Sequence, residues 1–80
     1  MISTNENKLI EIFRIVLDLN DDSDVTLVRQ ISESRWDSLA HVSLIAAIES
    51  EFALRLEIAD TEDRMSSFAA TRLLLEEMGL

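Results

Sequence analysis

The first pattern along the chain is an apolar stripe close to the N-terminus. Its members recur at intervals of three and four residues, the spacing that places side chains on one face of a helix: Leu9, Ile12, Phe13, Val16 and Leu17. Ser3 and Glu6 have the spacing of a capping box, in which each side chain satisfies a free amide of the first turn. The polar run Asn20–Asp24 follows the stripe, and its side chains compete for backbone hydrogen bonds. We therefore predict a helix from about Thr4 to Leu19.

A longer apolar pattern follows Asp37. It predicts a second helix, which takes Asp37 or Ser38 as its N-cap and ends near Ala53. We expect the face of this helix that meets the core to consist of one apolar stripe, widened by Leu44: Leu39, Val42, Ile45, Ile48 and Phe52.

A third helix is predicted at the C-terminal end of the chain. Ser66 or Ser67 is suited to cap its start, and Gly79 is suited to its C-terminal end. Its predicted buried face has Leu74 at the border and four further members: Phe68, Thr71, Leu75 and Met78. The polar stretch Glu57–Arg64 lies before this helix, and we expect it to hold one or two helical turns.

The stretch Val25–Arg35 fits three descriptions: a brief strand, a single helical turn, or a loop held by apolar anchors. A lone strand would have no partner elsewhere in the chain, so we expect a loop anchored by its apolar residues, which are Val25, Leu27, Val28 and Ile31. Together the patterns predict an all-α fold. It is a small bundle of three main helices and one short helix around one core, in a single domain that spans residues 1–80.

Composition narrows the class of protein. The 80 residues are 48% hydrophobic, which is too apolar for a disordered chain. Sixteen acidic against seven basic residues give a net charge of −9. This charge repels phosphate backbones, so we expect no nucleic-acid partner and expect charged partners to be basic. The longest uncharged run, Ser38–Ile48, is far shorter than the roughly 20 residues of a membrane span, so no span is expected.

The compartment is also constrained by composition. The chain has no cysteine, so it can form neither a disulfide nor a thiolate metal site. Its first residues lack the basic stretch followed by an apolar stretch that is typical of a secretory signal. Both features fit a reducing environment, and we expect a monomeric cytoplasmic protein.

Catalytic groups are scarce in this sequence. Acyl-transfer hydrolysis needs a nucleophile, a base and a group that orients the base, and His41 is the only histidine. Ser38 and His41 lie three residues apart on one predicted helix, so their side chains could be neighbours, but nothing marks a third member. We therefore expect no enzyme activity, and we interpret His41 as a helix residue at the edge of the solvent.

An acidic loop after the first helix shows part of a calcium-binding pattern. Three oxygen-bearing residues occupy the first, third and fifth positions of an EF-hand loop: Asp18, Asn20 and Asp22. The sixth position is Ser23 instead of glycine, and the twelfth is Arg29 instead of a bidentate glutamate. Such a loop cannot turn sharply or complete a calcium shell, so we expect no metal site.

The tetrapeptide Trp36-Asp37-Ser38-Leu39 carries a chemical possibility, because it places a serine at the first turn of the strongest predicted helix. Free amides and the positive end of the helix dipole would favour a phosphate attached to Ser38. The alternative is that Asp37 or Ser38 only caps the helix. Spacing alone favours this alternative, since Asp and Ser are among the commonest caps.

This part of the chain resembles the second helix of acyl carrier proteins, which reads D-S-L-x-x-V-x-L-V/I-x-x-x-E-x-E-F. Asp37-Ser38-Leu39 is followed at the family's spacing by Val42, Leu44, Ile45, Glu49, Glu51 and Phe52. One amphipathic helix and a long loop precede it. A short acidic segment and a final helix follow, joined by Met65-Ser66-Ser67-Phe68 where the family tends to have I/M-T-S/T-V. The resemblance covers nearly the whole chain.

The resemblance implies that Ser38 is the attachment site of a 4'-phosphopantetheine arm donated by coenzyme A, with Asp37 and Leu39 as its flanking residues. The arm ends in a thiol that holds acyl intermediates as thioesters during fatty-acid or polyketide synthesis. The implied partners are a phosphopantetheinyl transferase and the enzymes that load and transfer the cargo. The resemblance places partner docking on the second helix, at Asp37, Leu39, Val42, Glu49 and Glu51.

Three positions depart from the family's pattern. The family's main fatty-acid members usually have glycine two residues before the serine, and this chain has Trp36 there. The acids that are common at the second and fifth positions after the serine are Ala40 and Ser43 here. Enzymes that serve ordinary fatty-acid carriers through basic patches are expected to bind this face less well, so we predict a dedicated carrier for a specialised lipid or secondary-metabolite pathway. Two alternatives stay open. One is an aminoacyl or peptidyl carrier, and the other is an unmodified helical adaptor that uses an apolar groove.

Overall fold

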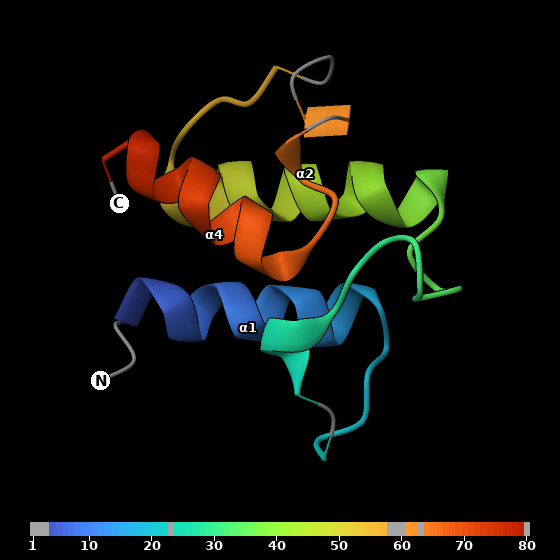
Figure 1. Ribbon diagram of the computed structural model, residues 1–80. Helices are drawn as coiled ribbons and strands as arrows, with labels where there is room; N and C mark the ends of the chain where they lie inside the picture. The colour runs from blue at the N-terminus through green and yellow to red at the C-terminus, as the bar shows by residue number, and fades with distance from the viewer. Residues whose placement is uncertain (1–3, 23, 58–60, 63, 80) are drawn as a thin grey trace.

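Three α-helices and one 3-10 turn form the regular structure in the computed structural model (Figure 1). The structure describes residues 4–22, 24–57, 61–62 and 64–79, and within these ranges it contains no strand. The elements are α1 (Thr4–Val16), η1 (Val25–Leu27), α2 (Ser38–Phe52) and α4 (Phe68–Glu77). The prediction of a small all-α fold is confirmed at this level.

The first helix is shorter than predicted. α1 ends at Val16, and Asp18 takes a left-handed conformation with a φ of 52°. The amide of Leu19 then donates to the carbonyl of Arg14 at 2.9 Å, which satisfies a free carbonyl of the last turn. Helix ends of this kind usually have glycine in the left-handed position, and Asp18 takes that position here. Leu17 is still buried, so the apolar stripe extends past the helix. Ser3, the first half of the predicted capping box, lies outside the described residues.

The bounds of α2 agree with the prediction, but its orientation does not. The side chains it buries are His41, Leu44, Ile45 and Ile48. Leu39 is 76% exposed and Val42 is 52% exposed, so neither belongs to the core stripe that we predicted. The error has a physical cause: α2 carries apolar residues on more than one face, and only the face that contains Leu44 and Ile48 belongs to the core.

The stretch before α2 is mostly a loop, as predicted, with one helical turn in it. Asp24 caps η1 by accepting a hydrogen bond from the amide of Thr26, and Val25 is buried as an anchor. Leu27 and Ile31 are exposed, which contradicts their predicted role as anchors. The loop is held instead by backbone pairing with the start of α4, in hydrogen bonds from Gln30 N to Ser66 O and from Phe68 N to Val28 O.

Helical backbone returns before α4, at Thr61, Glu62 and Arg64. Ile58 and Ala59, the apolar residues of the predicted short helix, lie outside the described residues. Ser67 caps α4 by accepting from the amide of Ala70, and four side chains of α4 are buried: Phe68, Thr71, Leu74 and Leu75. Met78 was expected on this face, but it is the C-cap residue after α4 and is exposed, so that assignment is wrong. Gly79 then has a positive φ of 98°, as its predicted place at the helix end requires.

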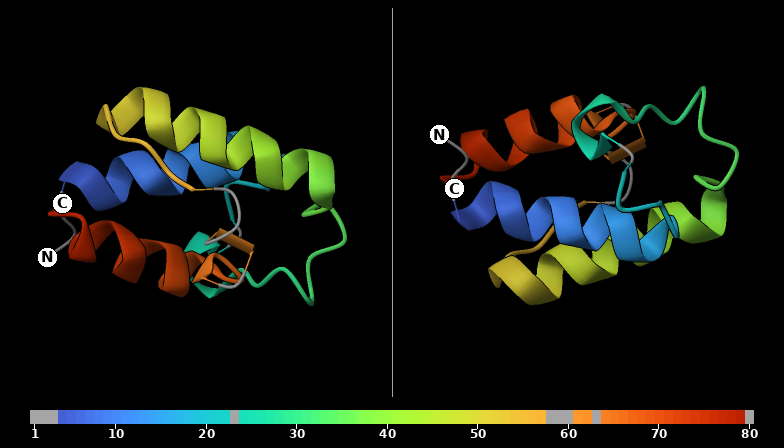
Figure 2. Two further views of the ribbon diagram at one scale, coloured as in Figure 1. Left: turned by 90° about the horizontal axis from the view of Figure 1, so that it is seen from above. Right: turned by 90° about the horizontal axis from the view of Figure 1, so that it is seen from below.

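α1 packs against both α2 and α4. α2 and α4 both run antiparallel to α1, and Figure 2 shows them on opposite sides of α1, which contacts both. Phe13 lies at the centre, with its ring edge-to-face against Trp36 and Phe68 at centroid distances of 5.2 Å in both cases. The radius of gyration is 11.5 Å, close to the value of about 12 Å expected for a compact domain of this length. Among the described helices, none combines the length and the apolar character needed to cross a bilayer.

Candidate functional site

Ser38 is the first residue of α2, and its side chain is exposed. The N-cap of the helix is Asp37, whose Oδ1 accepts a hydrogen bond from the amide of Ala40 at 2.8 Å. The capping role that the sequence left open between two residues therefore belongs to Asp37. Within the described residues, the hydroxyl of Ser38 has no hydrogen-bond partner, so it is available for chemistry on its oxygen.

Trp36, two residues before Ser38, anchors this part of the chain in the core. Trp36 is buried against Phe13, and its Nε1–H donates to Nδ1 of His41 at 3.1 Å. The guanidinium of Arg35 donates to the backbone carbonyl of Asp18, which ties the same stretch to the loop after α1. These contacts hold the start of α2 against the core and leave Ser38 on the outside.

His41 does not lie at the solvent edge, and that prediction is wrong. The side chain is 7% exposed and hydrogen-bonds at both ring nitrogens, with Trp36 at Nδ1 and with Oγ1 of Thr61 at 3.3 Å from Nε2. Burial lowers the pKa of His41 below the usual 6.5, and the nearby carboxylate of Glu62 opposes part of this shift. Since both nitrogens are engaged, neither is available as a base for Ser38.

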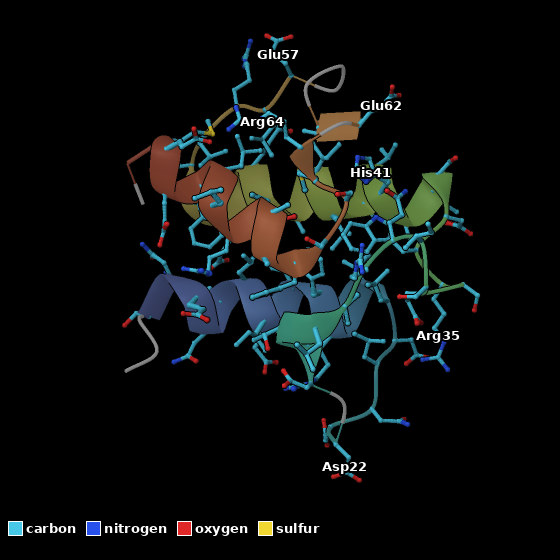
Figure 3. The ribbon with its side chains drawn as sticks, viewed as in Figure 1. Asp22, Arg35, His41, Glu57, Glu62 and Arg64 are labelled. Atoms are coloured by element: carbon cyan, nitrogen blue, oxygen red, sulfur yellow. The ribbon has the colours of Figure 1, made fainter. Side chains whose placement is uncertain are left out.

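Of the hollows that the described residues form, two follow one another along α2, and the first of them begins at Ser38. The first, of about 300 Å³, is lined by Gln30, Ser38, His41, Val42 and Glu62. The second, of about 550 Å³, shares Val42 with the first and continues along the helix, with these further lining residues: Ile45, Ala46, Glu49, Arg55, Leu56 and Glu57. Apolar side chains form the wall of the second hollow near Val42, and charged side chains surround its far part. Figure 3 shows His41 on α2 facing the segment that carries Glu62, with Glu57 on the same side of the molecule.

The structure brings together only some of the predicted docking residues. Asp37, Leu39 and Val42 lie around Ser38, and the two apolar members are exposed. Glu49 and Glu51 lie at the other end of α2, about 16 Å or more along the helix from Ser38. The exposed residues next to Ser38 on α2 are therefore the acidic N-cap Asp37 and the apolar Leu39 and Val42.

The two distant glutamates each have a structural partner. Glu49 is half-buried, and its Oε2 accepts a hydrogen bond from the amide of Leu56 at 2.8 Å. Glu51 forms an ion pair with Lys8, with 3.6 Å between Oε1 and Nζ. A change of charge at Glu49 thus alters the turn after α2 as well as the surface, so this residue is a poor position for testing docking alone.

No metal-binding arrangement stands out in the described part of the chain, where no group of three histidine, cysteine or acidic side chains is placed to hold an ion. Of the acids near the predicted loop, Asp24 is used as the cap of η1. A scan against protein-family models and searches among curated proteins and solved structures find no significant match to the chain.

Proposed function

We propose that this protein is a carrier domain whose Ser38 bears a 4'-phosphopantetheine arm. The observation that carries the proposal is the division of roles at the start of α2, where Asp37 caps the helix and the exposed hydroxyl of Ser38 is left without a partner among the described residues. A serine that only capped the helix would have its oxygen committed to a backbone amide. The oxygen of Ser38 is free to receive a phosphoryl group instead.

The position of Ser38 also suits the phosphodiester that attachment of the arm would form. A phosphodiester on Ser38 would lie at the N-terminus of a helix of 15 residues, where the first amides and the helix dipole favour negative charge. When bound, the arm supplies a terminal thiol that holds cargo as a thioester. The protein itself then needs no catalytic base, which agrees with the engagement of both nitrogens of His41.

The hollows along α2 provide a place for part of the arm or its cargo. They begin at Ser38 and pass Val42, Ile45 and Leu56, whose side chains offer an apolar wall. We infer a carrier of acyl intermediates for a specialised lipid or secondary-metabolite pathway. An aminoacyl or peptidyl carrier would use Ser38 in the same way, because partner enzymes choose the cargo.

The experiment is transfer of the arm from coenzyme A by a broad-specificity phosphopantetheinyl transferase, followed by measurement of the intact mass. The proposal predicts a gain of one phosphopantetheine per chain. An unmodified adaptor is the alternative that the exposed Leu39 and Val42 also favour, because apolar side chains on an outer face fit a protein partner. Absence of a mass gain, under conditions that modify a control carrier fully, would favour the adaptor.

A first prediction concerns the apolar docking face. Leu39→Ser should slow transfer of the arm to Ser38 by about tenfold, because a contacting residue at the centre of an interface contributes roughly 1–2 kcal/mol. Leu73→Ser is the matched control, since Leu73 is a 56% exposed leucine on α4. Initial rates of transfer measure both variants. Equal rates for Leu39→Ser and the wild type would place the docking contacts elsewhere.

A second prediction concerns charge. Ala40 is partly buried against the core, whereas Ser43 is exposed, so Ser43 is the better position for restoring an acid of the family's pattern. At low salt, enzymes that serve ordinary fatty-acid carriers should load Ser43→Glu roughly two- to fivefold faster than the wild type. The reason is that the basic docking patches of these enzymes attract the added carboxylate. Ser50→Glu adds the same charge on α2 about 18 Å from Ser38 and should have little effect. Equal acceleration by both variants would contradict a local docking effect.

A further inference from the structure

A buried polar trio joins the start of α2 to the segment before α4. Trp36 precedes α2, His41 lies on its second turn, and Thr61 belongs to the segment that crosses over it. All three side chains are buried. Apart from this trio and Thr71, the buried residues of the described chain are apolar, so these hydrogen bonds are a distinct connection within the core.

The hydrogen bonds of the trio fix the protonation state of the ring. The indole Nε1–H of Trp36 can only donate, so Nδ1 of His41 must accept and carries no proton. The proton of the neutral ring is then on Nε2, which donates to Oγ1 of Thr61. A second proton on Nδ1 would place two donors, Nδ1–H and the indole N–H, against each other at 3.1 Å. Protonated His41 is therefore incompatible with the trio as it stands.

Among the described residues, few charges near the ring of His41 offset this incompatibility. Glu62 is the charged group that acts on His41, and it favours the protonated form from the side of the crossing segment. Asp37, the N-cap residue before α2, is committed to capping the helix. Arg35, on the stretch before α2, donates to the loop after α1, and Arg64 forms an ion pair with α4. Glu62 thus supplies attraction for a proton without reaching the buried hydrogen bonds.

We propose that Trp36, His41 and Thr61 form a proton-sensitive latch that closes the segment at Thr61 onto the start of α2. Protonation of His41 breaks the contact with Trp36 and draws the ring toward Glu62. Because His41, Ser38 and Glu62 line the same 300 Å³ hollow, opening the latch changes the surroundings of Ser38 directly. The latch is a property of the unmodified chain, so it does not depend on the proposed carrier function.

The direction of the pH dependence follows from burial. The pKa of His41 is lower in the folded protein than the ordinary 6.5, so the unfolded chain binds the proton first as the pH falls. The stability contributed by neutral His41 is complete above pH 6.5 and is lost as the pH falls from there toward the folded-state pKa. The closed latch is therefore the state at neutral pH, and the open latch is the state in mild acid.

Fluorescence of the unmodified protein tests the latch, because Trp36 is the only tryptophan and His41 the only histidine. The emission of Trp36 should stay constant above pH 6.5 and change below it, while the helical signal in circular dichroism persists through the same range. His41→Gln is the matched variant, since a glutamine amide can accept from Trp36 and donate to Thr61 without titrating. Its emission should not change over that range.

A second measurement protects the test if His41→Gln does not fold. In nuclear magnetic resonance spectra of the wild type, the Nε1–H resonance of Trp36 should shift with the same midpoint as the ring protons of His41. The latch is contradicted if His41 titrates while the Trp36 resonance stays unchanged. It is equally contradicted if His41→Gln shows the wild-type transition, or if the helical signal is lost together with the change in emission.

Discussion

Replacing Phe13 with alanine should remove most of the stability of the protein. Phe13 is fully buried on α1 and contacts the rings of Trp36 and Phe68, so its loss leaves a cavity where three parts of the chain meet. A buried Phe→Ala change costs about 3–5 kcal/mol. A chain of 80 residues has a total stability of roughly 4–12 kcal/mol, so the cost is a large part of what is available.

Urea denaturation followed by circular dichroism measures this loss. Ile15→Ala is the matched control, because Ile15 lies on the same helix and is 74% exposed. Its effect should stay within about 0.5 kcal/mol, as for most surface changes. If the two variants lost the same stability, the arrangement of the core around Phe13 would be wrong.

Ser38→Ala should abolish attachment of the arm and leave the fold unchanged. The variant lacks the only oxygen that the proposal assigns to the phosphoryl group, so the expected loss of modification is complete. The fold should persist because Ser38 is exposed and Asp37 provides the cap of α2. The change in the free energy of unfolding should therefore be within about 0.5 kcal/mol.

Ser43→Ala is the control for this result. Ser43 is a second exposed serine on α2, so its replacement removes the same group from the same helix. This variant should be modified as completely as the wild type. Modification of Ser38→Ala, or an equal loss in both variants, would show that Ser38 is not the attachment site.

Helix positions could be predicted well from the sequence where polar caps stand beside apolar stripes. Asp37 and Ser67 mark the starts of α2 and α4 as their side chains suggested. The end of α1 was harder to predict, because Asp18 adopts a left-handed conformation that glycine would have signalled. Ala53 also has a left-handed conformation, with a φ of 53°, and it is the C-cap of α2, in agreement with the predicted end of that helix.

The face of α2 that meets the core could not be predicted from spacing. Leu39 and Val42 fit an apolar stripe as well as Leu44 and Ile48 do, and no local rule distinguishes the two sets. The choice depends on tertiary contacts, among them the hydrogen bond that draws His41 inward to Trp36. The error bears on function, because the residues wrongly assigned to the core are those that present an apolar surface beside Ser38.

His41 and Thr61 show a second limit. Twenty residues separate them, and the sequence around each gives no sign that they meet in the core. Their pairing depends on how the segment before α4 crosses α2, which is a feature of the fold. Ser38 differs from them because its position follows from local signals, namely a cap, a helix start and the residues that resemble a carrier motif.

Intact mass, measured side by side for the wild type and Ser38→Ala after reaction with coenzyme A and a broad-specificity transferase, tests the central claim most directly. The account predicts that the wild type gains one phosphopantetheine and that Ser38→Ala gains none, with the same helical signal in both proteins. A wild type that gains nothing while a control carrier in the same reaction is fully modified would contradict the claim.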